Sequence, residues 1–187
     1  MKITIKYVGL IVGTILVVCS FLFFGRQHNT YDALVLSGFS LACISFAMII
    51  FGKHSVRFKI IAVGIVVLCV TIEQLLEPIL IDTSYKTFIR QNEMTLNEIN
   101  HILASKSGDI SIINENIRDD SRLLTSTDKQ RLIASKQKLG VYLISKSDKS
   151  VYYGLWGFLD VRLGVSFWID KLEPPSHYRH LTGAWYH

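Results

Sequence analysis

Long runs of hydrophobic residues fill most of the first 81 positions of the chain. Three runs, over about residues 5–24, 33–51 and 58–80, are separated by short polar segments. A helix of about 20 residues rises about 30 Å, which matches the hydrocarbon core of a bilayer. The pattern therefore predicts a membrane block over residues 1–81 that contains three transmembrane helices.

Residues 82–187 have the mixed pattern of a soluble domain. Leu96, Ile99 and Leu103 have the spacing of one apolar helix face. This spacing predicts an amphipathic helix over residues 95–105, with its apolar face against the core of the domain.

A second helix of the soluble domain is predicted over about residues 128–138. Thr127 and Gln130 have the spacing of a capping box, in which both side chains bond to the free backbone amides at a helix start. Residues 109–117 fit a short strand or a helical turn, and the sequence leaves this choice open.

The last third of the chain is rich in the β-branched and aromatic residues that favour strands. Segments 141–144, 151–156 and 161–169 predict three strands, and Ser147–Ser150 predicts a hairpin turn between the first two. The tail from His177 is predicted to be irregular. The expected fold is α+β, with three transmembrane helices followed by a soluble domain that ends in an antiparallel β-meander covered by helices on one face.

Lysine and arginine are distributed unequally between the loops of the membrane block. Lys2 precedes the first run, Lys6 lies at its start, and a single arginine follows it. The loop between the second and third runs holds Lys53, Arg57 and Lys59. Because positive residues favour the cytoplasmic side, the N-terminus is predicted in the cytoplasm and the C-terminal domain outside it, in the periplasm of a Gram-negative cell. The first run exceeds the core of a signal peptide and no A-x-A site follows, so it is interpreted as a retained helix.

Small residues recur at intervals of four in the first two hydrophobic runs. Gly9 and Gly13 lie in the first run, and Gly38 and Ala42 lie in the second. Such pairs allow helix backbones to approach closely, either within the bundle or between copies of the chain in a homo-oligomer. Glycine and alanine are also common in membrane helices by chance, so both interpretations stay open.

Two acids, Glu73 and Glu77, lie on one face of the third predicted helix. A carboxylate inside the hydrocarbon core is costly and would indicate a proton relay or a contact with a partner. If the helix lies further out, both acids reach the interface and need no such role. Pro78 is expected to kink or end this helix, because proline lacks the amide donor.

Charge and cysteine content argue against two classes of protein. The net charge is +5, but the predicted soluble domain carries fourteen Lys/Arg against twelve Asp/Glu. This balance is not the basic footprint of a nucleic-acid-binding protein. The three cysteines all fall in the predicted membrane helices, so no disulfide framework is expected.

Aromatic residues concentrate in the C-terminal part of the soluble domain. Tryptophan and tyrosine anchor many protein interfaces, but they also fill the cores of sheets. The candidates for a binding surface are Trp156, Phe158, Trp168, Tyr178, Trp185 and Tyr186.

No motif typical of a catalytic, metal or cofactor site is found in the sequence. His177 and His180 offer two ligands where a metal site needs three or four. There is also no nucleophile elbow and no glycine-rich phosphate loop. The chain is therefore interpreted as a non-enzymatic, cofactor-free binding protein anchored in the lipid bilayer, whose outer domain recognises another protein. It would be an immunity-type protein that blocks a toxin, or an accessory subunit of a membrane complex.

Two other functions stay open at this point. The outer domain could sense a ligand and signal through a partner protein. Alternatively, several copies of the chain could form a transport pathway that uses Glu73.

Overall fold

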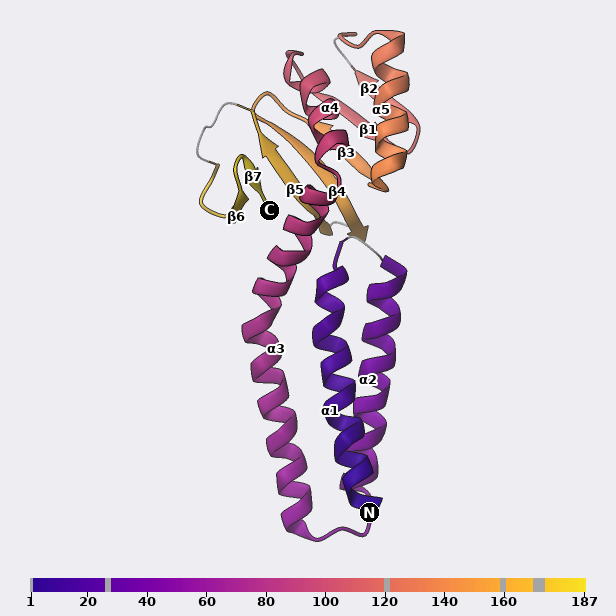
Figure 1. The fold of residues 1–187 in the computed structure, drawn as a ribbon, viewed down its shortest axis with the longest axis vertical. Coiled ribbons are helices and arrows are strands. Elements are labelled where there is room, and N and C mark those ends of the chain that lie inside the picture. Colours follow the sequence, from indigo (N-terminus) through magenta and orange to yellow (C-terminus); the bar gives the residue numbers. More distant parts are fainter. Residues whose placement is uncertain (1, 26–27, 120–121, 159–160, 170–173) are drawn as a thin grey trace. The chain divides into compact units, whose positions relative to one another are not determined.

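The computed structural model describes five stretches of the chain: residues 2–25, 28–119, 122–158, 161–169 and 174–187. The chain divides into two compact units, Met1–Ser84 and Tyr85–His187. The first unit, called here the helical unit, consists of helices, and the second, the C-terminal unit, combines helices with a sheet (Figure 1).

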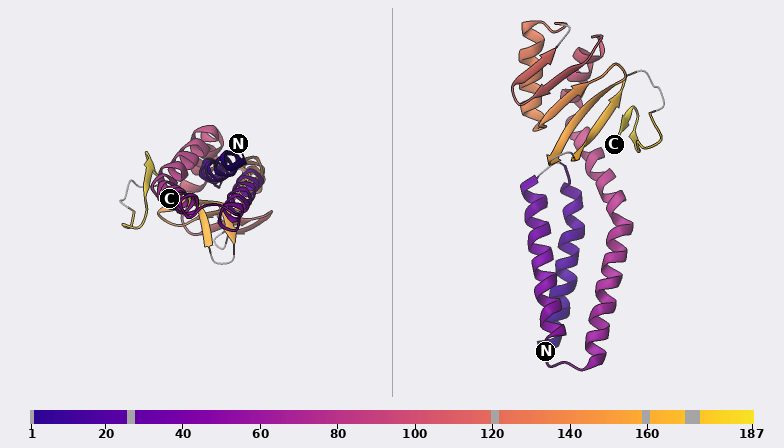
Figure 2. Two further views of the ribbon diagram at one scale, coloured as in Figure 1. Left: turned by 90° about the horizontal axis from the view of Figure 1, so that it is seen from below. Right: turned by 180° about the vertical axis from the view of Figure 1, so that it is seen from behind.

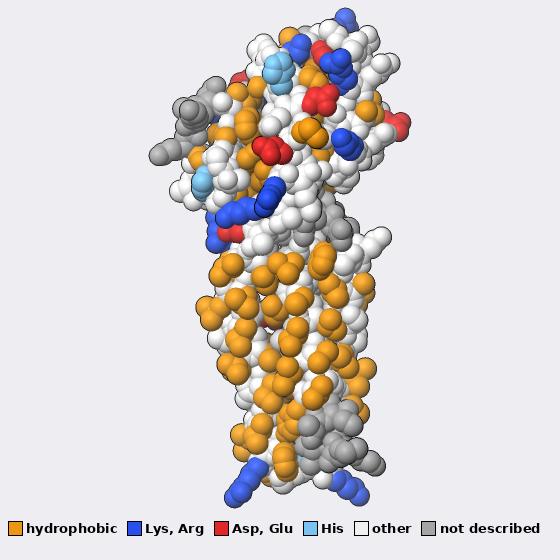
Figure 3. Space-filling view, in the orientation of Figure 1, with side chains coloured by type: hydrophobic (Ala, Val, Ile, Leu, Met, Phe, Trp, Pro, Cys, Tyr) orange, Lys and Arg blue, Asp and Glu red, His pale blue; other side chains and the backbone are white. Residues whose placement is uncertain are grey.

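Three long helices contribute to the helical unit. Helix α1 (Lys2–Ser20) continues into the short 3-10 helix η1 (Phe21–Phe23). Helices α2 (His28–Ile50) and α3 (Val56–Gln91) follow, and the last residues of α3 belong to the C-terminal unit. Hydrophobic side chains cover the visible face of the helical unit, whereas charged side chains of both signs are spread over the C-terminal unit (Figure 3).

Among the described residues, two helices are long and apolar enough to cross a membrane. The two are Asn29–Ile50 in α2 and Val56–Gln91, which is α3. In the most apolar 18-residue stretch of each helix, only 17% and 6% of the residues are buried. The core helix of a soluble protein is mostly buried, so neither helix resembles one. The prediction of three spanning helices is therefore not supported for α1. Its described apolar part, Tyr7–Phe23, is shorter than the roughly 20 residues that the hydrocarbon core requires.

Pro78 was predicted to kink or end the third helix, and the second alternative is wrong because α3 does not end there. The helix was expected to stop near residue 80, but it runs on to Gln91. Proline removes one hydrogen bond, yet its φ angle is compatible with a helix. Beyond it, Tyr85, Phe88 and Ile89 have helical spacing and are 1%, 3% and 7% exposed. Their burial in the C-terminal unit stabilises the helical turns that follow the proline.

The C-terminal unit contains a seven-stranded sheet in the order β2-β1-β3-β4-β5-β7-β6. All neighbouring strands are antiparallel, which confirms the predicted α+β class. The strands are β1 (Ile110–Ile113), β2 (Asn116–Asp119), β3 (Leu143–Lys146), β4 (Ser150–Phe158), β5 (Val161–Trp168), β6 (His180–Thr182) and β7 (Trp185–Tyr186). The open choice for residues 109–117 is thus decided in favour of strands.

The tail of the chain was predicted to be irregular, and this prediction is wrong. Strand β7 pairs with β5, with Phe167 opposite Trp185, and β6 pairs with β7. Backbone hydrogen bonds in both directions between Arg179 and His187 extend this last ladder. These strands are too short to show an alternating pattern, and long-range backbone pairing decides their conformation.

Two helices of the C-terminal unit, α4 (Glu93–Ala104) and α5 (Ser126–Leu139), lie on the same face of the sheet (Figures 1 and 2). Helix α4 confirms the helix predicted over residues 95–105. Its apolar stripe packs inward, and Leu96, Ile99 and Leu103 are fully buried.

A row of facing side chains crosses the centre of the sheet beneath these helices. Ile112 faces Ile144, which faces Tyr153, which in turn faces Val165. All four side chains are fully buried. The Tyr153 hydroxyl donates a 2.7 Å hydrogen bond to Asn100 Oδ1 of α4. This bond fixes α4 against the middle of the sheet.

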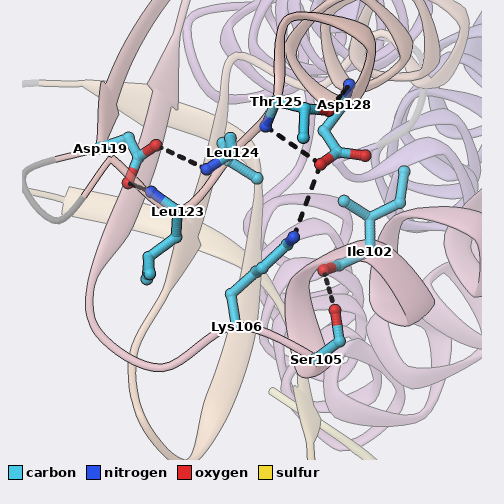
Figure 4. A network of polar contacts seen from close by, with 8 residues as sticks. All are labelled: Ile102, Ser105, Lys106, Asp119, Leu123, Leu124, Thr125 and Asp128. Atoms are coloured by element: carbon cyan, nitrogen blue, oxygen red, sulfur yellow. Dashed lines mark hydrogen bonds and ion pairs between the residues drawn. The ribbon is translucent and has the colours of Figure 1, made fainter.

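The start of α5 differs from the predicted capping box by two residues. Thr125 is the N-cap: its hydroxyl accepts from the Asp128 amide at 3.1 Å, and the Asp128 carboxylate accepts from the Thr125 amide at 3.2 Å (Figure 4). Thr127 lies inside the helix instead. The bond from the Thr125 backbone, and after it the Thr125 side chain and Lys106, hold the pKa of Asp128 below its usual value.

Replacing Thr125 by alanine should therefore lower the free energy of unfolding of the C-terminal unit by about 1 kcal/mol. Thr127→Ala is the matched control and should change it by less than about 0.5 kcal/mol. All three tryptophans of the chain lie after residue 155, so tryptophan fluorescence during denaturation reports on this unit. Equal losses in the two variants would show that the cap is assigned to the wrong threonine.

The loop before α5 is held by a second carboxylate, Asp119. Its two oxygens accept hydrogen bonds from the amides of Leu123 and Leu124, at 3.0 and 2.9 Å (Figure 4). Burial alone would raise the pKa of Asp119, but the amides of Leu124 and Leu123 outweigh it and lower this pKa. Because the folded-state pKa values of Asp119 and Asp128 are both depressed, their contribution to stability is present at neutral pH. It is lost as the pH falls below about 4.

Candidate binding groove

A groove of about 570 Å³ in the C-terminal unit lies between the end of α3, the start of α4 and the β6–β7 hairpin. We call it the C-terminal groove. Its lining residues are Lys86, Ile89, Arg90, Glu93, Leu96, Asn97, Leu181, Thr182, Gly183, Ala184 and Trp185. A cleft of this size is within the usual range for ligand and peptide sites.

The base of the groove is apolar. Ile89, Leu96, Leu181 and Trp185 line it and are each less than a tenth exposed. These side chains pack into the core of the C-terminal unit, so their positions do not depend on a ligand in the groove. A ligand would therefore meet a preformed apolar surface, which reduces the ordering cost of binding.

The rim of the groove carries exposed charges. Lys86 and Arg90 lie one helical turn apart on α3, and Glu93 lies in the first turn of α4. The rim thus offers two cations and one carboxylate around an apolar base. Such an arrangement suits a segment with an apolar side chain and a nearby acid.

Trp185 anchors the hairpin that forms one side of the groove. Its ring lies 5.6 Å from the Tyr153 ring and 5.2 Å from the Phe167 ring, measured between centroids. The turn of the hairpin contains Gly183 with φ of 54°, a left-handed conformation that glycine adopts readily. The His180 ring bonds to the Gly183 carbonyl at 3.0 Å. The hairpin is therefore fixed at both its base and its turn.

The predicted aromatic binding residues are divided between two faces of the sheet. Trp185 is opposite Phe167, so both point to one face. Trp168 follows Phe167 directly and points to the other face, where its ring makes a T-shaped contact with Tyr178 at 5.7 Å. Of the two tryptophans, only Trp185 lines the C-terminal groove.

The other three aromatic candidates lie elsewhere in the sheet. Tyr186 makes a T-shaped contact with His180 at 5.0 Å. Trp156 is opposite Leu163, after a bulge that shifts the register of β4. Phe158 ends β4, and its side chain lies outside the described part of the structure. Of the five candidates whose side chains the structure describes, Trp185 alone lines the groove.

The small residues of the helical unit meet at the contact between α1 and α2. A Cβ atom at Gly13 would lie 2.6 Å from the Gly38 carbonyl oxygen and 2.7 Å from the Ala42 amide nitrogen. A Cβ atom at Gly9 would collide with the Ser45 hydroxyl. The two helix backbones are thus in contact at these positions within a single chain.

The two acids of α3 have different surroundings. Glu73 lines a cavity in the helical unit, and Glu77 is not among the residues that line it. The sequence places both acids on one helix face, since they lie one turn apart, but it does not predict that only Glu73 lines a cavity.

Sequence reasoning missed most of the C-terminal groove, although a signal for it was present. Tyr85, Phe88 and Ile89 continue the helical spacing beyond Pro78 and lead into the stripe of α4. Because the third helix was predicted to end near residue 80, this continuation was not recognised, and Ile89 was not predicted as a groove residue.

Within the described stretches, no group of three or more His, Cys, Asp or Glu side chains is arranged to hold a metal ion. No protein-family model matches the chain, and no curated protein or solved structure matches it either.

Proposed function

We propose that the chain is a non-enzymatic, membrane-anchored binding protein whose C-terminal unit recognises a segment of another protein. The C-terminal groove carries this proposal. It combines a preformed apolar base with a charged rim, which is the composition of many peptide-binding clefts.

The membrane part of the proposal rests on the length and exposure of α2 and α3. We propose that α1 crosses the bilayer as well, since its backbone contacts α2 through Gly13 and Gly38. Three crossings and the positive loop with Lys53, Arg57 and Lys59 would place the N-terminus in the cytoplasm. The C-terminal unit would then face the outside, or the periplasm of a Gram-negative cell.

The proposed occupant of the groove is a protein segment with an apolar anchor next to a carboxylate. The apolar side chain would cover Leu181 and Trp185, and the carboxylate would pair with Lys86 or Arg90. An immunity-type protein and an accessory subunit would both use such a contact. They differ in whether the partner is a toxin or a permanent subunit.

The groove can be tested by filling it. Ala184→Trp should block the groove from its open side, because Ala184 lines it and is only half-buried. Gln130→Trp, on the exposed side of α5, is the matched control. The full-length protein is solubilised from its native membrane for this test. We expect the control to bind the partner as the wild type does. In Ala184→Trp the affinity for the partner should fall roughly tenfold, which corresponds to about 1.4 kcal/mol.

A charge reversal supplies a second variant if the tryptophan disturbs folding. Lys86→Glu combined with Arg90→Glu should weaken binding of the same partner. Arg131→Glu on α5 should leave this binding unchanged. Recovery of the wild-type chain alone under several mild detergents would contradict the proposal. Undiminished partner recovery by both groove variants would contradict the assignment of the groove.

Transport through an oligomer remains the second candidate, and Glu73 in the helical unit is the observation that favours it. Unchanged ion flux in Glu73→Gln would remove this candidate.

A further inference from the structure

An apolar cavity in the helical unit contains a single charged side chain, Glu73. The cavity has a volume of about 290 Å³ and is lined by residues of α1, α2 and α3. The lining includes Leu10, Phe39 and Val70, with Cys43 and Cys69 as weakly polar groups. We call it the Glu73 cavity.

Two hydrogen bonds of the helical unit lie on either side of the cavity. Near one end, the Tyr7 hydroxyl donates a 2.7 Å hydrogen bond to the Phe58 carbonyl. Near the other end, the Ser84 hydroxyl donates a 2.8 Å hydrogen bond to the Phe24 carbonyl. Along α3, the residues that line the cavity, from Val66 to Glu73, lie between these two bonds. The opening is thus a feature of the middle of the bundle rather than a frayed end.

Glu73 lies in the middle of the part of α3 that has no cation. A rise of about 1.5 Å per residue places it about 20 Å from both Lys59 and Lys86. A helix shifted far enough outward to bring Glu73 to the interface would expose Leu75, Leu76 and Ile79 beyond it to water. The continuous helix therefore favours a position of Glu73 within the hydrocarbon core.

The chain itself offers no cation to Glu73 at this depth. Residues 7–25, 28–52 and 60–85 contain no lysine or arginine. Thr14, which also lines the cavity, donates its hydroxyl to the Leu10 carbonyl of its own helix. Among the described residues, Glu73 has no hydrogen bond or ion pair. A second copy of the chain would bring the same cation-free segments, so self-association would leave the carboxylate without a counter-charge.

We propose that the Glu73 cavity receives one lysine or arginine side chain from a transmembrane helix of a partner protein. The apolar lining suits the methylene stem of such a side chain, and Glu73 suits its charged end. A bare metal ion fits poorly, because the cavity offers one carboxylate and almost no other oxygen ligand. Exposed apolar residues of α3, such as Val67 and Leu68 at 61% and 59%, would contact the body of the partner helix.

This contact is independent of the C-terminal groove. A partner could use both sites, but the groove variants leave Glu73 unchanged and the Glu73 variants leave the groove unchanged. Failure of one set of experiments is therefore distinguishable from failure of the other.

The test uses the purified full-length protein in phosphatidylcholine vesicles, with energy transfer to a labelled peptide as the readout. The peptide is a polyleucine transmembrane helix with one central lysine, and a peptide with leucine at that position is the control. We expect the lysine peptide to associate about tenfold more tightly than the control peptide. Glu73→Gln should abolish this preference, whereas Glu77→Gln should retain it, because Glu77 does not line the cavity.

The cysteines provide a second readout of where the peptide binds. Cys43 and Cys69 line the cavity and Cys19 does not. Alkylation by a small, membrane-permeable maleimide should slow at Cys43 and Cys69 when the lysine peptide is present, but not at Cys19. This pattern also confirms that the protein is folded in the assay.

Three outcomes would overturn the proposal. The first is equal association of both peptides with the wild-type protein, and the second is an unchanged preference in Glu73→Gln. The third is a combined effect of phosphatidylethanolamine in the vesicles. The preference for the lysine peptide is lost when this lipid is added, and the lipid without peptide protects Cys43 and Cys69 from alkylation. That result would assign the cavity to a lipid amine. Conversely, Glu73→Lys should prefer a peptide with a central glutamate, and this exchange would support the proposed pair directly.

Discussion

Gly13→Ala is expected to separate α1 from α2 and to lower the stability of the helical unit by about 1–3 kcal/mol. The added methyl group would lie 2.6 Å from the Gly38 carbonyl oxygen and 2.7 Å from the Ala42 amide nitrogen. Backbone atoms cannot rotate away as a flexible side chain can, so the helices themselves must move apart. Thermal unfolding of the detergent-solubilised protein, followed by circular dichroism, measures the loss.

Gly64→Ala is the matched control for this change. Gly64 lies within α3, and a Cβ atom there would meet nothing within 4 Å. Alanine favours a helix over glycine by about 1 kcal/mol, so Gly64→Ala should be neutral or stabilising. If Gly13→Ala were as harmless as Gly64→Ala, the close contact of α1 with α2 would be wrong.

Tyr153→Phe is expected to destabilise the C-terminal unit by about 1–3 kcal/mol and to lower its melting temperature by several degrees. The change removes the hydroxyl that donates to Asn100 Oδ1, and Asn100 is only 5% exposed. The cost is that of leaving a buried acceptor without its donor. Tryptophan fluorescence during denaturation measures it, because all tryptophans of the chain lie in this unit.

Tyr142→Phe is the matched control, because the Tyr142 hydroxyl is buried and has no hydrogen-bond partner among the described residues. Its removal should be neutral or slightly stabilising. A loss in Tyr142→Phe equal to that in Tyr153→Phe would mean that the effect arises from packing and not from the bond to Asn100.

The same tyrosine predicts the alkaline behaviour of the C-terminal unit. Burial raises the pKa of Tyr153 well above its ordinary value of 10.0. Above that pH the unfolded chain releases the tyrosine proton and the folded chain keeps it, so the unfolded state is favoured. The stability is therefore complete below about pH 10 and falls as the pH rises further. Tyr153→Phe should show a smaller fall over the same interval.

The large features of the fold follow from local patterns in the sequence. The hydrophobic runs that became α2 and α3 are recognisable because their length and composition match a bilayer. The strands β3, β4 and β5 are recognisable because β-branched and aromatic residues recur in short segments separated by a polar turn. These elements depend mainly on properties of neighbouring residues.

The features that the sequence did not predict depend on contacts between distant residues. Thr125 and Thr127 both begin segments with the spacing of a capping box, and the pattern alone does not choose between them. The bonds of Asp119 to the loop, with Leu124 buried before the cap, select Thr125. In the same way, the pairing of Phe167 with Trp185 decides that Trp185 reaches the groove while Trp168 faces the opposite side.

The long helix α3 shows how such contacts also set the candidate sites. Its continuation through Pro78 places Ile89 in the base of the C-terminal groove and Glu73 in the middle of a cation-free helix. A helix that ended at the proline would have allowed Glu73 to reach the interface. The burial of Tyr85 and Phe88 beyond the proline therefore explains both the position of Ile89 and the depth proposed for Glu73.

Extraction of native membranes with alkaline carbonate measures most directly whether the exposed apolar helices lie in lipid. We expect the full-length chain to stay with the membrane pellet after this treatment and after washing with high salt, and to leave it only with detergent. Recovery of the folded chain in the carbonate or salt supernatant would show that α2 and α3 do not cross a bilayer.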